Sequence, residues 1–301
     1  MDPLNQIGLQ SMMNVSSGHP DIVIGVIDGP VDLNHPAFQT SNIKTVRDSQ
    51  VDACKNATSL ACSHGTFIAG ILCANRGFSA PAICPNCKFI FNPIFKEDAN
   101  NTNNKNIIVP SVTPEELTNA IIETVDAGAR IINLSLGLSS SSLTTYDKLQ
   151  QAYDYALRKG VIIVVAAGNY GYIGNISLIN HKWLIPVAAC NEDGRLDPSS
   201  NFGASIGNRG VMAPGINIKS TFPGGEYTHM SGTSVAAPFV TGSIALLWSI
   251  FPNTTPAAIM HSITIGTSFK RRSIIPQLLD VEAAWKLCKI LTLSGGHTIT
   301  Q

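Results

Sequence analysis

The chain has 301 residues, of which 44% are hydrophobic and only 13% are charged, with 20 Lys and Arg residues against 20 Asp and Glu residues. This length is sufficient for one sizeable α/β core, and a formal net charge of zero gives no electrostatic reason to expect nucleic acid or a membrane as a partner. We expect no bilayer-spanning stretch, and the N-terminal residues lack the basic and apolar regions of a secretory signal, which predicts a cytoplasmic location.

Apolar runs predict the first elements of the chain. Residues 22–27 are continuously apolar, as in a strand of a parallel sheet that is covered on both faces, and this run ends at Asp28. A carboxylate at the end of an apolar strand belongs to a functional site more often than to a solvated surface, so Asp28 is a candidate site residue. A second apolar run follows His64-Gly65-Thr66 and predicts a helix that opens at His64. Residues 88–94 predict another strand.

The middle of the chain alternates between helices and strands. Thr113-Pro114-Glu115-Glu116 predicts a helix start with a capping box, and this helix should end at Gly128. A strand, a helix and a buried strand are then expected over residues 130–137, 146–159 and 161–165. This alternation predicts a parallel sheet with helices on both faces.

A serine precedes the longest apolar run. Ser234 lies in Gly232-Thr233-Ser234-Val235-Ala236-Ala237-Pro238, and we expect it at a helix N-terminus, where free N–H groups favour a developing oxyanion. Pro238 then falls in the first turn, where no intrahelical N–H is needed. The ordinary alternative is a capping serine. A serine nucleophile needs a base and an orienting acid, and His64 and Asp28 are candidates in the chain order Asp, His, Ser.

Five short blocks resemble the signature blocks of the subtilisin-like serine proteases. In chain order they are Val26-Ile27-Asp28-Gly29, His64-Gly65-Thr66, Ala166-Ala167-Gly168-Asn169, Met212-Ala213-Pro214-Gly215 and Gly232 to Pro238. The resemblance implies a three-layer α/β fold with a mostly parallel central sheet and an Asp-His-Ser triad of Asp28, His64 and Ser234. It implies that Asn169 contributes to the oxyanion hole. By the same resemblance, the substrate backbone and the residue before the cut contact Ser135, Leu136, Gly137, Ala166, Ala167 and Gly168.

A narrower resemblance suggests a substrate class. Asp28-Gly29-Pro30-Val31-Asp32, followed by His35-Pro36, is similar to the cyanobactin-maturation proteases, whereas most subtilisin-like enzymes have Ser or Thr after the catalytic Asp. This implies an endopeptidase that cuts a ribosomal precursor peptide between leader and core. The alternatives are a broad degradative intracellular protease, a peptide macrocyclase and an inactive peptide-binding scaffold. The 36 residues from Asp28 to His64 leave scant room for the helical lid of the macrocyclases.

Seven cysteines leave at least one thiol unpaired in a monomer. The pairs Cys54–Cys62 and Cys84–Cys87 allow free thiols, two local disulfides or a four-cysteine zinc site. Secreted relatives often hold calcium in acidic loops, but residues 74–79 contain one arginine and no carboxylate. We therefore expect no required metal and no other cofactor. Residues 1–288 are assigned to the peptidase domain, and residues 289–301 to a tail or the start of a linker.

Overall fold

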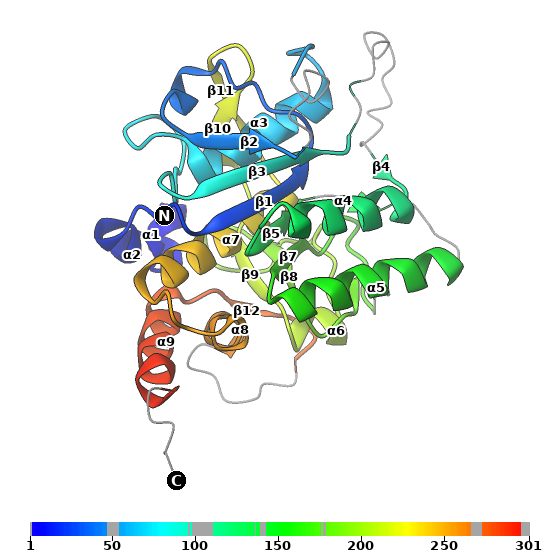
Figure 1. Cartoon of the computed structure of the whole chain (residues 1–301), viewed down its shortest axis with the longest axis vertical. Helices are drawn as coiled ribbons and strands as arrows, with labels where there is room; N and C mark the ends of the chain where they lie inside the picture. The colour runs from blue at the N-terminus through cyan, green and yellow to red at the C-terminus, as the bar shows by residue number, and fades with distance from the viewer. Residues whose placement is uncertain are drawn as a thin grey trace.

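The computed structural model describes residues 2–46, 54–95, 97, 111–135, 137–138, 143–174, 176, 179–265 and 273–295. In this part of the chain, an eight-stranded parallel sheet lies between two layers of helices (Figure 1). Along the sheet the strands are β12 (Gln277–Leu278), β9 (Val211–Pro214), β8 (Leu184–Cys190), β7 (Ile162–Ala166), β5 (Ile131–Leu134), β1 (Val23–Asp28), β3 (Lys88–Pro93) and β2 (Asn42–Thr45).

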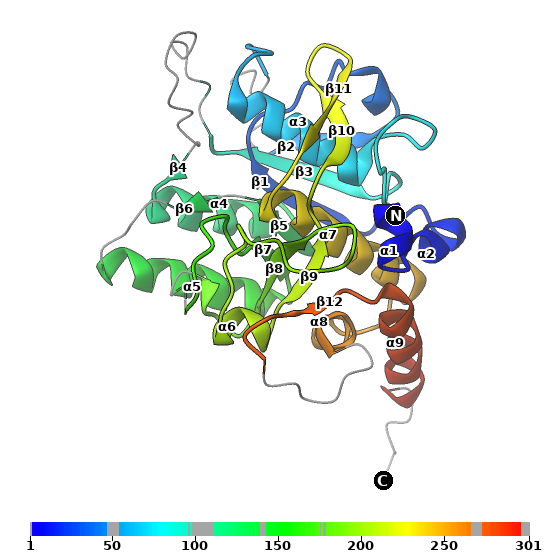
Figure 2. The same ribbon diagram turned by 180° about the vertical axis from the view of Figure 1, so that it is seen from behind.

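Helices cover both faces of the sheet, as the alternating pattern predicts. One face carries α3 (Leu60–Cys73) and α7 (Thr233–Ile250), and the other carries α4 (Pro114–Asp126) and α5 (Leu143–Lys159). In the view from behind, α7 lies next to the central strands, which it contacts at β5, β7, β8 and β9 (Figure 2). The other described helices are α1 (Pro3–Gln6), α2 (Leu9–Val15), the 3-10 turn η1 (Pro36–Phe38), α6 (Ala204–Gly207), α8 (Pro256–Ile265) and α9 (Val281–Gly295).

Two short strand pairs lie outside the main sheet. The strands β10 (Ile218–Phe222) and β11 (Glu226–Met230) form an antiparallel hairpin that packs on α3. The strands β4 (Ser111–Val112) and β6 (Gly137–Leu138) form a parallel pair. The hairpin leads directly into α7, so its position fixes where α7 begins.

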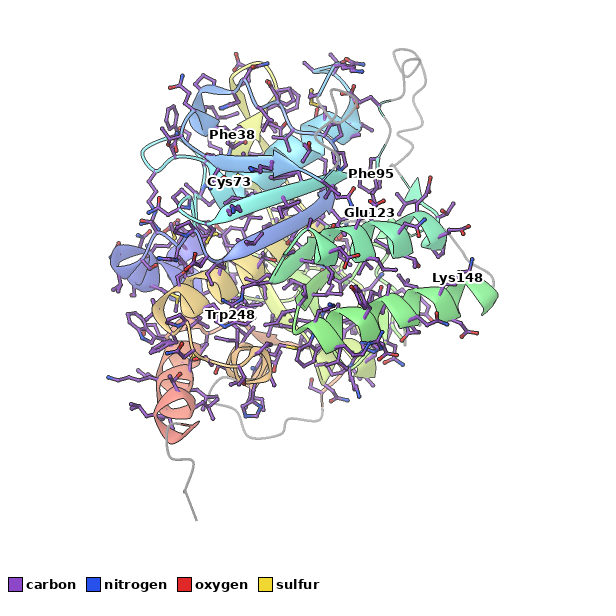
Figure 3. All side chains as sticks on the ribbon, in the orientation of Figure 1. Phe38, Cys73, Phe95, Glu123, Lys148 and Trp248 are labelled. Carbon is purple, nitrogen blue, oxygen red and sulfur yellow. A yellow bond between two sulfur atoms is a disulfide. The ribbon has the colours of Figure 1, made fainter. Side chains whose placement is uncertain are left out.

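The two faces of the sheet form two apolar cores, because alternate residues of a strand point to opposite faces. In β7, Ile162 and Val164 pack on the α3–α7 side, whereas Ile163 and Val165 pack on the α4–α5 side. Trp248 lies in the first core and Phe95 in the second (Figure 3). Strands buried on both faces explain why the sequence shows continuous apolar runs.

The helix start predicted at Thr113 is confirmed. Thr113 accepts a hydrogen bond from the backbone of Glu116, and the Glu116 carboxylate accepts one from the backbone of Thr113. The helix ends at Asp126, and Gly128 takes a positive φ of 95° that a residue with a side chain rarely adopts.

Two expectations need correction, the start of α3 and the absence of a stretch long and apolar enough to span a bilayer. Helix α3 begins at Leu60 rather than at His64, because the Ser59 hydroxyl caps the N–H of Cys62. The domain boundary expected at residue 289 stays a prediction; α9 crosses it and continues through residues 289–295, where the Thr292 hydroxyl contacts that of Thr254. Among the described helices, α7 is long and apolar enough to cross a membrane, but 83% of that stretch is buried inside the structure, as in the core helix of a globular fold.

Of the alternatives left open for the two cysteine pairs, the structure has a different one at each pair. Cys54 and Cys62 form a disulfide, whereas Cys84 and Cys87 are free thiols. Both free thiols are buried at a tight turn, where the N–H of Cys87 donates to the carbonyl of Cys84. The Cys84 thiol donates a hydrogen bond that lowers the pKa of Cys87, while burial raises the pKa of Cys84. Cys73 is likewise a free thiol buried in the core.

Candidate active site

The candidate catalytic residues lie at one edge of the sheet. Asp28 is the last residue of β1, Ser135 directly follows β5, and Asn169 comes three residues after β7. These three strands are neighbours in the order β7-β5-β1, and all run in the same direction. Because parallel strands end at the same edge, the fold brings together residues that are more than 100 positions apart in the sequence.

Asp28 and His64 form a hydrogen-bonded pair. The Nδ1 atom of His64 lies 2.7 Å from Oδ1 of Asp28, which also accepts a 2.6 Å hydrogen bond from the backbone N–H of Gly29. The carboxyl group is fully buried, whereas the imidazole is one quarter exposed. A carboxylate at Nδ1 favours the tautomer with its proton there, which leaves Nε2 as the basic atom.

The charge state of His64 depends on two opposing effects. Burial disfavours the imidazolium, but the charge of Asp28 and its hydrogen bond outweigh burial, so the pKa of His64 lies above its ordinary value of 6.5. Among the described residues, the other carboxylate oxygen of Asp28, Oδ2, has no hydrogen-bond partner. The pair is therefore held chiefly through Oδ1.

Close packing of α3 explains why a glycine follows Asp28. A Cβ at Gly29 would collide with the carbonyl oxygen of Ala61, and a Cβ at Gly65 would collide with that of Gly29. The first turns of α3 therefore pack directly on the backbone that follows β1. This close packing places His64 next to Asp28. The Ser or Thr found here in most subtilisin-like enzymes would not fit without a shift of α3.

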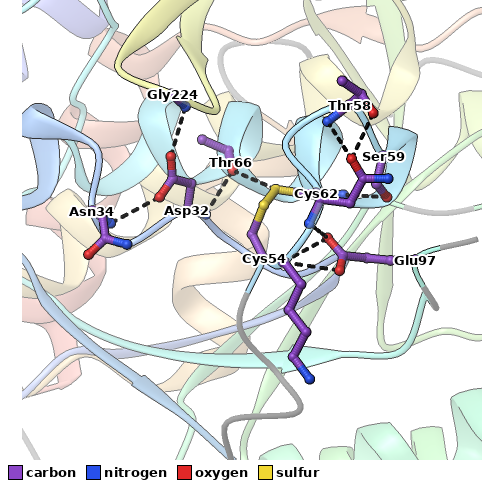
Figure 4. The surroundings of a disulfide bond; sticks show 11 residues. Asp32, Asn34, Cys54, Thr58, Ser59, Cys62, Thr66, Glu97 and Gly224 are labelled. Carbon is purple, nitrogen blue, oxygen red and sulfur yellow. Dashed lines mark hydrogen bonds between the residues drawn. A yellow bond between two sulfur atoms is a disulfide. The ribbon is translucent and has the colours of Figure 1, made fainter. Parts of the chain in front are cut away.

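The disulfide lies beside His64 on the same helix. Cys62 is two residues before His64, and its partner Cys54 fixes the loop that precedes α3 (Figure 4). The Glu97 carboxylate accepts hydrogen bonds from the backbone N–H groups of Lys55 and Asn56. The disulfide therefore ties Cys54 to the start of α3, while Glu97 ties Lys55 and Asn56 to the segment that follows β3.

Side chains of the β10–β11 hairpin bind α3, the helix of His64, and the hairpin is followed in the chain by Ser234. The hydroxyls of Ser220 and Thr221 donate to the α3 carbonyls of Phe67 and Thr66 at 2.8 and 2.7 Å. At the hairpin turn, the N–H of Gly224 donates to Asp32, as Figure 4 shows. Strand β11 ends four residues before Ser234, so these contacts fix the serine relative to α3.

Ser234 is the second residue of α7, as predicted, but Pro238 lies beyond the first turn. Because proline has no N–H, the carbonyl of Ser234 lacks the helical donor that residue 238 would otherwise provide. The Ser135 hydroxyl donates to this carbonyl at 2.9 Å and replaces the missing bond. Ser135 in turn accepts from Asn133 at 2.7 Å, and Asn133 accepts from Thr241 at 2.8 Å.

Asn169 is fixed by the N-terminus of α7. Its amide oxygen accepts a 2.8 Å hydrogen bond from the N–H of Thr233, and the Thr233 hydroxyl accepts one from the N–H of Gly168. The Asn169 amide nitrogen lies 3.0 Å from the place that a Cβ on Gly232 would occupy. With its oxygen engaged, the exposed side chain of Asn169 has its NH₂ group next to Gly232, two residues before Ser234 in the chain. This arrangement can donate a hydrogen bond to an oxyanion.

Asn201 is a site residue that the sequence did not indicate. Its side-chain oxygen accepts hydrogen bonds from the N–H groups of Tyr170 and Tyr172, and its nitrogen donates to the carbonyl of Ala167. The nitrogen lies so close to Gly168, which has a φ of 99°, that a Cβ there would collide with it. Asn201 thereby fixes the loop that carries Asn169. An asparagine in a Ser-Asn-Phe-Gly stretch gives no signal beyond that of an ordinary turn.

The predicted substrate-contact residues have different positions. Ala166 and Ala167 are buried, and Gly168 is partly exposed beside Asn169. Ser135 is buried and its hydroxyl bonds inside the protein, so only its backbone remains available to a peptide. Gly137 begins β6 and pairs with β4, while Leu136 lies outside the described residues. Their contact with substrate stays a prediction.

The loop after α3 does not fit a calcium site. Its charged group is Arg76, whose guanidinium donates to the carbonyls of Met13, Ser16 and Ile83 at 2.6, 2.8 and 3.0 Å. A cationic side chain thus binds the backbone oxygens that a metal would need. In the described part of the chain, one cluster has metal-ligand side chains, Cys54, Cys62 and Glu97, but its two sulfurs are bonded to each other.

Comparison with curated proteins gives several relatives. A thermophilic serine proteinase from Bacillus sp. (strain AK1) is 35% identical over 238 residues, which cover 78% of this chain and 54% of that protein. Fervidolysin from Fervidobacterium pennivorans is 31% identical over 84% of this chain and 38% of its own length. The chain therefore spans about half of the first relative and less of the second.

Solved structures with the same fold include maturation proteases. The prenylagaramide maturation protease PagA superposes with a TM-score of 0.77 at 25% identity, over 93% of this chain and 98% of its own. The patellamide maturation protease PatA gives 0.71 at 27% identity, over 90% and 98%. The PatG macrocyclase in complex with a peptide gives 0.75 at 21% identity, over 95% and 98%, which shows the fold alone.

The family assignment rests on most of the chain. The model of the Subtilase family matches residues 19–275, a span that includes Asp28, His64, Asn169 and Ser234. The match agrees with the parallel sheet and with the order of the sequence blocks. This chain belongs to the subtilase family of subtilisin-like serine peptidases.

Proposed function

We propose that this chain is a serine endopeptidase that cleaves a ribosomal precursor peptide at one site, between its leader and its core. The observation that carries the catalytic part is the arrangement of three groups. A buried carboxylate orients His64, Ser234 lies at the N-terminus of α7, and Asn169 is hydrogen-bonded to the same N-terminus, at Thr233, with its NH₂ group next to Gly232.

Each residue has one task in the proposed reaction. Nε2 of His64 takes the proton of the Ser234 hydroxyl as the oxygen attacks the carbonyl carbon of the scissile bond. The carbonyl oxygen becomes negative and accepts hydrogen bonds from Asn169 and from the backbone N–H of Ser234. His64 then gives its proton to the leaving amine, and water releases the acyl group by the same route. Asp28 stabilises the imidazolium and keeps its orientation.

Two observations favour a maturation substrate over general degradation. The glycine after Asp28 has a structural cause here, since α3 packs against it, and this glycine belongs to the block that resembles the maturation proteases. PagA and PatA, whose names describe them as maturation proteases, match over nearly their whole chains. A peptide is accordingly the proposed partner, and the cytoplasm the proposed location.

Mass spectrometry of products tests the proposal. The wild-type protein and Ser234→Ala, which lacks the nucleophile, are incubated with full-length precursor-type peptides and with a random peptide library. Cleavage at one sequence motif, absent in Ser234→Ala, is expected. Broad cutting of the library would support a degradative protease, a product with its termini joined would support a macrocyclase, and no cleavage by folded wild-type protein would support a scaffold.

A further inference from the structure

Exposed apolar side chains gather beside Asn169. Eleven large hydrophobic residues are exposed in the described part of the chain, and five of them lie in two neighbouring segments. We call these five the apolar platform. It consists of Tyr170 (80% exposed), Tyr172 (53%), Ile173 (63%), Ile274 (49%) and Ile275 (43%).

Backbone hydrogen bonds join the segments of the platform. Phe202 binds the first segment, residues 170–174: its N–H donates to the carbonyl of Tyr172 at 3.0 Å, and its carbonyl accepts from Gly174 at 2.9 Å. The next residue, Gly203, donates to the carbonyl of Ile274 at 3.0 Å. The residues of the platform are therefore neighbours in space although about 100 positions separate them in the sequence.

The platform is displayed on a fixed backbone. Asn201 binds the N–H groups of Tyr170 and Tyr172, and Gly171 donates to the carbonyl of Ser199 at 2.7 Å. The ring of Tyr172 lies over Gly174, close to where a Cβ would stand. Side chains that are exposed on such an ordered loop lose little entropy when a partner covers them.

The position of the platform points to the peptide substrate as its partner. Tyr170 directly follows Asn169, so the platform is continuous with the catalytic residues. Residues 170–174 follow β7, and their partner Phe202 comes after β8. In the order β8-β7-β5-β1, β8 lies on the side of β7 that is away from β1, the strand that ends at Asp28. The platform therefore extends away from Asp28. No Asp, Glu, Lys or Arg occurs in residues 170–174, 199–207 or 273–275. An uncharged surface of this kind fits neutral, apolar side chains.

We propose that the apolar platform is an exosite that begins at Tyr170 beside Asn169 and, through its other four residues, binds apolar side chains of the substrate peptide at a distance from the scissile bond. This inference rests on the proposed peptidase function. A substrate that extends over the platform gains affinity by burying aromatic and aliphatic surface, whereas a short substrate that ends near the cut does not reach it. The exosite would thus select long peptides with an apolar segment at a fixed spacing from the cut.

A pair of substrates tests the exosite. Both carry the cleavage motif found with wild-type protein, and one continues on either side with Leu and Phe residues while the other ends close to the cut. The test variant combines Tyr172→Ser, Ile173→Ser and Ile274→Ser. The matched control is Leu293→Ser, which removes an equally exposed apolar side chain on α9, far along the chain from the site.

The expected result separates the two substrates. For the long peptide, the KM of the triple variant should rise by about tenfold or more, as for the loss of contact residues at an interface. For the short peptide both kcat and KM should stay within about twofold, and Leu293→Ser should match wild type on both. Thermal melts establish that all variants are folded.

Several outcomes would overturn the exosite. An unchanged KM for the long peptide, while wild-type protein still cuts it at one site, removes the exosite and leaves the proposed function intact. An equal loss on both substrates assigns these residues to the catalytic site or to stability. A wild-type dimer that the triple variant loses in sedimentation assigns the surface to a second copy of the chain. If wild-type protein cleaves neither substrate, the proposed function itself fails.

Discussion

The contact between Ser135 and the Ser234 carbonyl predicts a specific coupling with Pro238. Replacing Ser135 with Ala removes the bond to Ser234 and the bond from Asn133, both in a buried region. Two lost hydrogen bonds and their unsatisfied partners should lower the free energy of unfolding by about 2–3 kcal/mol. At about 2–4 °C per kcal/mol, the melting temperature should fall by about 4–12 °C.

A double-mutant cycle with Pro238→Ala isolates the proposed cause. Alanine at position 238 restores an N–H that can donate to the Ser234 carbonyl, so Ser135→Ala should cost about 1 kcal/mol less in that background. Denaturant unfolding of the four proteins, at constant m-value, measures this coupling. Ser243→Ala is the matched control, because this buried hydroxyl on α7 donates to the carbonyl of Phe239, its hydrogen-bond partner among the described residues, and should be additive with Pro238→Ala. Additive effects of Ser135→Ala and Pro238→Ala would refute the reasoning.

Three further predictions concern protonation, thiols and metal. Catalysis needs neutral His64, whose pKa is raised, so the acid limb of kcat/KM should have its midpoint above about 6.5; a midpoint below this value would contradict the Asp28 pairing. The interaction between Asp28 and His64 also contributes to the free energy of unfolding. This contribution is complete at pH values below the pKa of His64 in the unfolded chain, and it is lost as the pH rises through the higher pKa of His64 in the folded protein. Thiol titration of the unfolded, unreduced protein should find five free thiols, and titration after reduction should find seven. A count of three before reduction would show that Cys84 and Cys87 are also bridged. Arg76→Met should lower the stability by about 1–3 kcal/mol, whereas EGTA should leave the melting temperature of wild-type protein unchanged; a fall that calcium reverses would overturn this assignment.

Features set by local sequence were predictable. The continuous apolar runs gave the central strands, and Thr113 and Glu116 gave the start of α4, because a buried parallel strand and a capping box each need only a few adjacent residues. The triad and Asn169 followed from the resemblance of short blocks. The structure places Asp28 and His64 in direct contact and locks Asn169 onto the start of α7.

Features that depend on distant contacts were not predictable. The bond from Ser135 to Ser234 spans 99 positions, and Pro238 alone does not show that another donor replaces its missing N–H. Asn201 acts on a loop about 30 positions away, and its neighbours read as an ordinary turn. For Cys84 and Cys87, spacing allows a bridge, but the turn between them and the surrounding core decide whether the sulfurs bond.

Asn169 gives the last prediction, because the structure separates its two possible roles. Its oxygen binds the N–H of Thr233, which is a structural contact, while its NH₂ group is the one available to an oxyanion. Asn169→Asp keeps the oxygen and removes the NH₂ group, whereas Asn169→Leu removes both. If the NH₂ group stabilises the transition state, both variants should lose about 10²–10³ in kcat with KM nearly unchanged, a magnitude known from subtilisin. Only Asn169→Leu should also lower the melting temperature, since it leaves the N–H of Thr233 without its acceptor. Kinetics and thermal melts on the two variants measure these effects separately. Wild-type kcat in a folded Asn169→Asp variant would remove Asn169 from the oxyanion hole.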